Sequence, residues 1–213
     1  GLARSSAADV LLRIEDHDQQ RSRPEFDAAL IEDLVWLGFS ADRGPVRQTD
    51  PDALAAYGDA LRSLLARGLV YGCDCTRATF GAWATTHGRA WSGPGCPGDC
   101  RARDVDGPVL RGALGGGGES WVDRLAGPCE DDVAPFGDLP IRDRDGNWTY
   151  GFCVVVDDLR HGVDLVVRGR DLLHATASQI RLARLLGRRS PPTFAHHALI
   201  RRPDGRKLSK SAG

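Results

Sequence analysis

The sequence predicts an α/β fold with a parallel sheet that is interrupted by one irregular insertion. Short apolar runs alternate with stretches of helical periodicity near both ends of the chain, the pattern of strands joined by helices. Between them, residues 71–118 are rich in Cys, Gly, Pro, Arg and Trp and lack sustained periodicity, and residues 115–118 are four consecutive glycines. We therefore expect sheet-forming segments on both sides of an insertion that is not a second core.

Composition indicates a folded globular protein. The chain has 213 residues, of which 41% are hydrophobic and 27% charged, so disordered and fibrous classes are excluded. The formal net charge of -1 argues against a broadly basic nucleic-acid surface but allows a local basic patch. No apolar run approaches the roughly 18 residues of a membrane helix, and no signal peptide is recognisable at the first residues. We expect a cytoplasmic protein.

The first sheet-forming part reads as a strand followed by two helices. Residues 10–14 form a short apolar run that ends in an acidic group at 15–18. Ser22 is a candidate N-cap before a proline and a capping-box glutamate, and the helix that follows ends at Gly38. A second helix starts at Asp50, and Gly68 closes it. The apolar residues at helical spacing are Phe26, Leu30, Leu34 and Leu37 in the first helix and Leu54, Tyr57, Leu61, Leu64 and Leu65 in the second.

The part after Pro140 is predicted to hold two strands and a helix. Residues 152–156 and 163–167 are apolar and rich in valine, which favours strands. Residues 180–186 carry apolar side chains at helical spacing, and Gly187 closes that helix.

Four of the six cysteines are clustered in two pairs. Cys73 and Cys75 form a C-x-C motif, and Cys96 and Cys100 form C-x3-C. Four thiolates suffice for a closed tetrahedral zinc site with Zn–S distances of about 2.3 Å. Disulfides, which need an oxidising compartment, and free thiols are the alternatives. The two remaining cysteines are Cys129 and Cys153, of which the second lies in an apolar run and is expected in the core.

The two lysines of the chain lie close together. Lys207 and Lys210 stand in the segment Arg-Lys-Leu-Ser-Lys-Ser at 206–211, after a loop that contains Gly205. Ammonium groups and serine hydroxyls at this spacing are suited to a polyphosphate. The alternative is a solvated basic loop.

Taken in order, four segments resemble the catalytic domain of class I glutamyl-tRNA synthetases. They are Leu-Arg-Ile-Glu-Asp at 12–16, Tyr150 with Val-Val-Val-Asp-Asp at 154–158, Val-Arg-Gly-Arg-Asp-Leu at 167–172 and Lys-Leu-Ser-Lys-Ser at 207–211. The resemblance implies a Rossmann-like parallel sheet with a zinc-binding insertion. It divides the chain into a first catalytic part at 1–70, a zinc-containing insertion at 71–140 and a second catalytic part at 141–213.

Within that superfamily the cysteine motifs are similar to those of shorter paralogues that attach glutamate to queuosine in the anticodon loop of tRNA(Asp). The resemblance implies a ligase that uses glutamate, ATP with Mg²⁺, structural zinc and queuosine-bearing tRNA(Asp), acting as a monomer. In such paralogues the third zinc ligand is often a tyrosine, so Cys96 gives an all-cysteine version. Two alternatives stay open: the catalytic fragment of a glutamyl-tRNA synthetase that charges tRNA(Glu), and a non-catalytic zinc-bearing RNA-binding module.

The resemblance also implies roles for individual residues. Glu15 matches a position that binds the glutamate ammonium, Arg168 one that grips a carboxylate, and Tyr150 a tyrosine that lines the same pocket. Lys210 matches the ATP-contacting lysine, with Lys207 beside it in the catalytic loop. Catalysis would rest on positioning and charge stabilisation, because the attacking carboxylate is already ionised at pH 7.

Each of the three pocket residues has a plainer interpretation. Glu15 could be a carboxylate at the end of a strand, Tyr150 a core aromatic, and Arg168 a structural partner of Asp157 or Asp158. The family also begins with a strand that carries an arginine for glutamate and a His-x-Gly-His signature for ATP, neither of which is present in this sequence. We therefore expect the chain to be a fragment or a truncated product.

Overall fold

The computed structural model describes residues 1–18, 22–88, 95–201 and 204, and the structural statements below concern those residues. The helices are α1 (Leu2–Ser5), α2 (Pro24–Trp36), α3 (Pro51–Ala66), α4 (Arg77–His87), α5 (Asp99–Ala102), α6 (Tyr150–Arg160), the 3-10 helix η1 (Arg170–Ala175) and α7 (Thr176–Leu185). The strands are β1 (Leu11–Ile14), β2 (Arg43–Arg47), β3 (Val70–Cys73), β4 (Val109–Gly112), β5 (Gly118–Asp123), β6 (Gly127–Asp132), β7 (Leu139–Arg142), β8 (Leu165–Gly169) and β9 (Thr193–His197).

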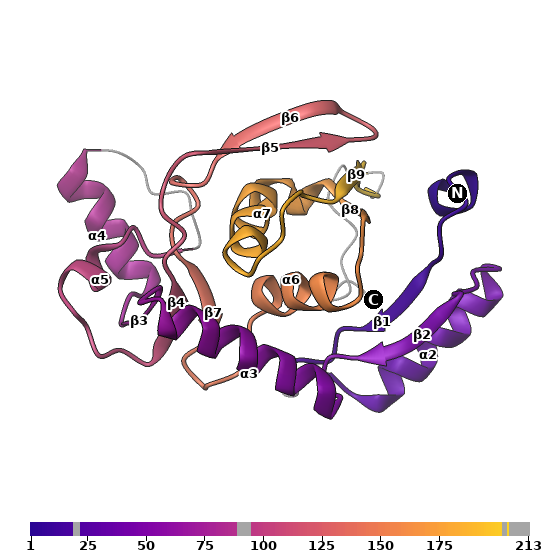
Figure 1. Cartoon of the computed structure of the whole chain (residues 1–213), viewed down its shortest axis with the longest axis horizontal. Helices are drawn as coiled ribbons and strands as arrows, with labels where there is room; N and C mark the ends of the chain where they lie inside the picture. The colour runs from indigo at the N-terminus through magenta and orange to yellow at the C-terminus, as the bar shows by residue number, and fades with distance from the viewer. Residues whose placement is uncertain (19–21, 89–94, 202–203, 205–213) are drawn as a thin grey trace.

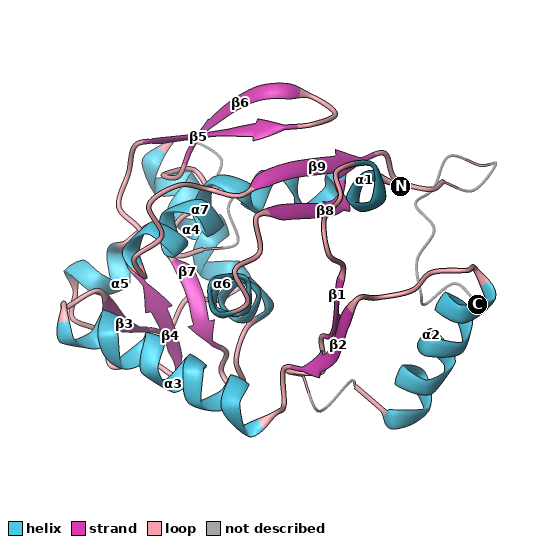
Figure 2. Cartoon of the chain, turned by 45° about the vertical axis from the view of Figure 1, so that its right-hand side comes forward, coloured by secondary structure: helices cyan, strands magenta, loops and turns pink. Residues whose placement is uncertain are grey.

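The strands form parallel and antiparallel groups (Figure 2). β1 pairs in parallel with β2, and β8 pairs in parallel with β9 over its whole length. β5 joins β9 in parallel at Asp123 and Phe194, and β6 is its antiparallel partner, so the order is β6-β5-β9-β8. β3, β4 and β7 form a separate antiparallel sheet. The predicted α/β class with parallel strands is confirmed.

The main core lies around two central helices. Figure 1 shows α6 and α7 side by side at the centre, with the β5–β6 hairpin above them and α3 below. Tyr57, Ile141, Phe152, Ile180 and Leu182 are fully buried there. Burying a large apolar side chain contributes about 1.5–3 kcal/mol, so this cluster is the principal source of stability. Cys153 also lies in this core, as predicted.

The prediction of a strand at residues 152–156 was wrong. These residues belong to α6, which starts at Tyr150 after the N-cap Thr149. All five are buried, so this stretch of the helix is enclosed by the core on every side. A short continuous apolar run does not distinguish a buried helix from a buried strand, and three valines favoured the strand.

The predicted strands at 10–14 and 163–167 are present, with boundaries shifted by one or two residues, and the helix before Gly187 is present but begins four residues before the predicted apolar positions, at Thr176. The first predicted helix is also present as α2, but Ser22 does not cap it. Arg23 occupies the N-cap position and makes no side-chain cap hydrogen bond. The apolar face of α2 is exposed, with Phe26 61% and Leu30 50% accessible.

The second predicted helix is α3, and its apolar face is largely buried. Tyr57 and Leu64 lie in the main core, while Leu54 and Leu65 at the edges of the face are exposed. Gly68 follows the helix with a positive φ of 64°, which favours glycine.

The region expected to be irregular contains more regular structure than its composition indicated. Strands β3 and β4 and helices α4 and α5 lie within it. Five of its side chains form a second small buried cluster: Cys73, Cys75, Cys96, Cys100 and Val109. Gly72 and Gly107 allow the backbone segments that carry them to pass close to each other. A Cβ on Gly107 would lie 2.3 Å from the carbonyl carbon of Cys73. Strands of four residues are too short to show a period. Among the described helices, none has the length and apolar character needed to cross a bilayer.

Candidate functional site

The three predicted pocket residues come from different elements, and the two charged ones lie near the phenol of the third, Tyr150. Glu15 directly follows β1, Tyr150 is the first residue of α6, and Arg168 lies in β8. Burial raises the pKa of Tyr150 to about 12; the negative charge of Glu15 adds to the rise and the positive charge of Arg168 opposes it. Both charged groups are therefore near enough to act on the phenol. The fold brings together an anionic, a cationic and a hydroxyl-bearing side chain.

Arg13 links β1 to α6 beside this pocket. Its guanidinium donates to Asp158 at 2.8 Å and to Glu15 at 3.1 Å. Burial lowers the pKa of Arg13, but the negative charges of Asp158 and Glu15 outweigh that effect and raise it. Arg13 thus holds the Glu15 carboxylate in place. The sequence analysis did not assign it a role, although alternate residues of a strand share a face, which places Arg13 beside Glu15.

Three uncharged side chains accept hydrogen bonds from the guanidinium of Arg168 and fix its position. Its Nε donates to Nε2 of His196 at 3.0 Å, Nη1 to Oε1 of Gln179 at 2.5 Å, and Nη2 to Oγ1 of Thr176 at 2.8 Å. The carboxylate of Asp158 is bonded to Arg13 instead. Because no carboxylate is bonded directly to Arg168 within the described chain, its positive charge is available to an anionic ligand.

A buried network supports the base of the pocket. The fully buried Asp157 accepts hydrogen bonds from Gln48 at 2.8 Å and Tyr57 at 2.9 Å. Gln48 in turn accepts from Nδ1 of His17 at 2.6 Å, and the His17 ring lies 6.1 Å from that of Tyr150. The network ties α3 and the segments after β1 and β2 to α6. These residues lie far apart in sequence and carry no shared pattern, so sequence reasoning did not predict the contacts between them.

An open cleft of about 600 Å³ lies between β1 and β8. Arg13, Glu15, Asp158 and His161 contribute polar side chains to its wall. The wall of the cleft is therefore charged. Lys207 and Lys210, the other two predicted site residues, lie outside the described residues, and their contact with ATP stays a prediction.

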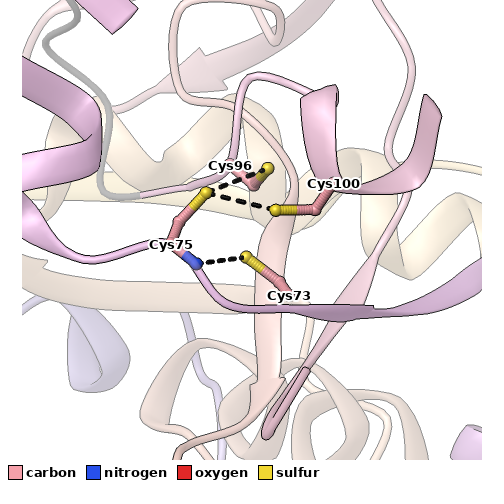
Figure 3. Close-up of side chains that lie close together, drawn as sticks. All are labelled: Cys73, Cys75, Cys96 and Cys100. Atoms are coloured by element: carbon pink, nitrogen blue, oxygen red, sulfur yellow. Dashed lines mark hydrogen bonds between the residues drawn. The ribbon is translucent and has the colours of Figure 1, made fainter. Parts of the chain in front are cut away.

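The four clustered cysteines converge on one point (Figure 3). Their sulfur atoms all lie within 4.8 Å of one another; Sγ of Cys75 is 3.8 Å from that of Cys96 and 3.3 Å from that of Cys100. Four sulfurs bound to one zinc ion at about 2.3 Å would lie about 3.8 Å apart. All six cysteines of the chain are free thiols, and the donor set fits structural zinc.

Basic and N–H groups surround this cluster. Nε of Arg111 donates to Sγ of Cys73 at 3.0 Å, and Nη1 donates to the Asp138 carbonyl at 3.0 Å. The backbone N–H of Cys75 also points to Sγ of Cys73 at 3.4 Å. Tyr71 donates to the Asp138 carboxylate at 2.7 Å, which fixes the loop that carries it. Donors of this kind stabilise sulfur that carries negative charge, as it does when it binds zinc.

Comparisons with known proteins agree with this geometry. The family model described as "tRNA synthetases class I (E and Q), catalytic domain" matches residues 1–86 and 108–213. The chain is 41% identical to a glutamyl-Q tRNA(Asp) synthetase of Symbiobacterium thermophilum, covering 99% of this chain and 70% of that protein. It is 38% identical to glutamate–tRNA ligase 1 of Acidithiobacillus ferrooxidans, covering 99% of this chain and 46% of that protein.

Solved structures show the same fold. The chain superimposes with a TM-score of 0.77 on a glutamate tRNA ligase from Elizabethkingia meningosepticum in complex with its amino acid, at 25% identity. That match covers 100% of this chain and 47% of the ligase. A glutamate-tRNA synthetase from Elizabethkingia anophelis matches with a TM-score of 0.78 at 25% identity, covering 99% of this chain and 47% of that one. The chain spans about half the length of these two ligases.

Proposed function

Because this chain belongs to the class I tRNA synthetases for glutamate and glutamine, whose members are ligases, we propose that it activates glutamate with ATP and transfers it to queuosine of tRNA(Asp). The observation that supports the proposal is that the charges of Glu15 and Arg168 both act on the buried phenol of Tyr150. The queuosine acceptor is supported by the 41% identity to a glutamyl-Q tRNA(Asp) synthetase. The cysteine insert, with its two closely spaced pairs, agrees with that assignment.

The pocket residues suit the two charged ends of free glutamate. The Glu15 carboxylate, held by Arg13, binds the substrate ammonium, and the Arg168 guanidinium binds a substrate carboxylate. The Tyr150 hydroxyl keeps its proton at neutral pH, because burial raises its pKa to about 12, and so it can donate to the substrate. The substrate α-carboxylate then attacks the α-phosphate of ATP, which gives glutamyl-adenylate and pyrophosphate.

The remaining partners follow from this proposal. We assign Lys210 to charge stabilisation at the ATP phosphates, with Lys207 in a lesser role; Mg²⁺ enters with ATP and neutralises phosphate charge. Zinc, held by Cys73, Cys75, Cys96 and Cys100, is structural. We also propose that the protein acts as a cytoplasmic monomer, with an insertion at 71–140 between two catalytic parts.

Two other functions are considered. The first differs from the proposed one in the RNA that accepts glutamate, and the second differs in lacking the activation step. A glutamyl-tRNA synthetase would charge tRNA(Glu), and the 38% identity to a glutamate–tRNA ligase favours that candidate. A zinc-bearing RNA-binding module would bind RNA without forming an adenylate. The exposed polar cleft beside Glu15 favours a small-molecule site over such a module.

The test has two stages. All activity assays, here and below, use a chain to which the arginine strand and the His-x-Gly-His signature of the family have been restored. Glutamate-dependent ATP–pyrophosphate exchange measures activation, and transfer of labelled glutamate is then compared on tRNA(Asp) with queuosine, tRNA(Asp) without it, and tRNA(Glu). We expect exchange, and label on the first RNA alone. Label on tRNA(Glu) would establish the synthetase, and absence of exchange would leave the binding module. Glu15→Gln should raise the glutamate KM, whereas Glu25→Gln on the exposed face of α2 serves as the matched control.

A further inference from the structure

A buried acid and histidine lie directly behind Arg168. Asp123, at the end of β5, and His196, in β9, are 1% and 2% exposed. Oδ2 of Asp123 lies 2.6 Å from Nδ1 of His196, and Nε2 of the same ring lies 3.0 Å from Nε of Arg168. The three side chains therefore form one continuous chain of hydrogen bonds across three neighbouring strands.

The contact with Arg168 determines which ring nitrogen of His196 carries the proton. A guanidinium only donates hydrogen bonds, so Nε2 of His196 must accept from Arg168. The single proton of the neutral ring then lies on Nδ1 and is donated to Asp123. Only this tautomer satisfies both contacts.

Asp123 is itself held rigidly. Its Oδ1 accepts the backbone N–H groups of Leu125 at 2.8 Å and Ala126 at 3.0 Å, and its Oδ2 accepts the backbone N–H of His196 at 3.2 Å. Both oxygens are therefore engaged before the imidazole contact is counted. The carboxylate cannot rotate without breaking bonds to the turn that follows β5.

We propose that Asp123 and His196 are positioning residues that hold the Arg168 guanidinium in the geometry for binding the substrate carboxylate; this rests on the proposed function, which places glutamate at Arg168. His196, Thr176 and Gln179 accept three of the five N–H bonds of a guanidinium. Within the described chain, no protein acceptor takes the other two. The network thus orients the guanidinium of Arg168 and leaves two of its N–H donors for a ligand.

The charges around His196 favour its neutral form. Burial lowers its pKa, and the positive charges of Arg168 in β8 and Arg170 in η1 add to that effect, while Asp123 in β5 opposes it. Protonation would place an N–H on Nε2 against the N–H of Arg168. Binding of glutamate through Arg168 should therefore weaken as the pH falls through the pKa of His196.

Substitutions at two positions separate positioning from folding. In Asp123→Asn the amide nitrogen replaces an acceptor beside Nδ1, so the ring proton moves to Nε2 and opposes Arg168. His196→Asn keeps a donor near Nδ1 but removes the acceptor for Arg168, whereas His196→Gln places its Oε1 near the position of Nε2 and retains that acceptor. His197→Asn is the matched control, because the His197 side chain is exposed and, among the residues that the structure describes, its bond is to the neighbouring Ala198 carbonyl.

Two measurements are made on each variant. Nitrogen-15 NMR of the imidazole rings reports which nitrogen carries the proton, and ATP–pyrophosphate exchange gives KM for glutamate and kcat across pH. We expect the Nδ1–H tautomer in the wild type and Nε2–H in Asp123→Asn. Asp123→Asn and His196→Asn should raise KM by about 10- to 100-fold with a smaller change in kcat, because misplacing a binding group by about 1 Å has effects of that order. His196→Gln should stay within about threefold of the wild type.

The outcomes distinguish this inference from the proposed function. If Arg168→Ala abolishes glutamate use while Asp123→Asn and His196→Asn leave KM unchanged, the positioning role is wrong and the proposed function stands. If Arg168→Ala itself has no effect, the assignment of glutamate to Arg168 fails. A wild-type ring with its proton on Nε2, or equal KM values for His196→Gln and His196→Asn, would also overturn the positioning role. Thermal unfolding of each variant confirms that it is folded.

Discussion

The cysteine cluster and the pocket at Arg168 are built in opposite ways. The cluster is formed by two short motifs between Cys73 and Cys100, and their spacing alone predicted which four cysteines lie together. The pocket draws on β1, α6 and β8, and its support comes from β5 and β9. The side chains of a site built from local motifs can be predicted together. A site assembled from distant segments reveals its charged residues in sequence but conceals the buried groups that orient them.

This difference predicts that the two sites can be disrupted separately. The cysteines lie around the β3-β4-β7 sheet and the short helix α5, whereas Arg168 and His196 lie in the β6-β5-β9-β8 sheet. The larger apolar core lies around α6 and α7 and does not include the four cysteines. Loss of metal should therefore disorder the insertion and leave the pocket network intact.

The largest expected effect is the loss of zinc in Cys100→Ser. Structural zinc sites bind with apparent free energies of about 10–16 kcal/mol, and removing a thiolate from a closed site should lower affinity by more than about 10³-fold. Metal analysis should give about one equivalent of zinc in the wild type and almost none in the variant. Cys129→Ser, outside the cluster, is the control and should retain zinc. Full zinc in Cys100→Ser would refute the ligand set, and loss of the imidazole NMR signature of His196 would refute the independence of the two sites.

The second effect concerns Lys210, which extends the comparison to the nucleotide side of the pocket. Lys210→Ala should slow ATP–pyrophosphate exchange by about 10²–10³, the usual consequence of removing one group that stabilises charge developing in the transition state. Glutamate binding should change much less. Lys207→Ala should have a smaller effect, and parental exchange in Lys210→Ala would make the loop a solvated surface feature.

The third effect tests whether the pocket depends on shape as well as charge. Arg168→Lys keeps the positive charge but loses the planar fork, and with it at least one hydrogen bond to the substrate carboxylate. The glutamate KM should rise about 10- to 100-fold, the range for one charge-assisted hydrogen bond. Titration of exchange activity with glutamate measures it. An unchanged KM and kcat would remove Arg168 from the pocket.

The pocket also shows where sequence reasoning stops. Glu15, Tyr150 and Arg168 stand in recognisable motifs, and the fold brings them together. His196 follows an apolar strand residue with no pattern around it, and Asp123 ends a strand that the sequence analysis did not predict. Buried polar groups are specified by pairing across strands, which depends on topology rather than on local spacing. Likewise, residues 152–156 are five consecutive buried apolar residues, a run that fits a buried strand as well as a buried helix, so the sequence alone did not reveal the helix.

A fourth, smaller effect sharpens the description of the metal centre. Arg111→Met removes the buried donor to Sγ of Cys73, and zinc affinity should fall by about tenfold, near the lower limit for outer-shell partners. Arg103→Met removes an exposed guanidinium 3.7 Å from Sγ of Cys100 and should change affinity little. Competition with a chromogenic chelator measures both. Equal affinities for the two variants would show that burial of the donor is irrelevant.

The smallest effect is a change in how the free energy of unfolding depends on pH, and it concerns the buried histidine behind the pocket. The pKa of folded His196 lies below that of an unfolded histidine, about 6.5, so below this pH the unfolded chain binds a proton that the folded chain does not. The free energy of unfolding should therefore fall as the pH drops from about 6.5 towards the folded pKa. The pKa of Asp123 is also lowered, because its bonds to His196 and to backbone N–H groups outweigh burial, but its contribution is lost only below about pH 4, where an unfolded aspartate protonates. Urea unfolding between pH 7 and 5 should thus show a smaller slope in His196→Asn than in the wild type or in His197→Asn. Identical slopes in all three proteins would mean that His196 is not held neutral by the pocket.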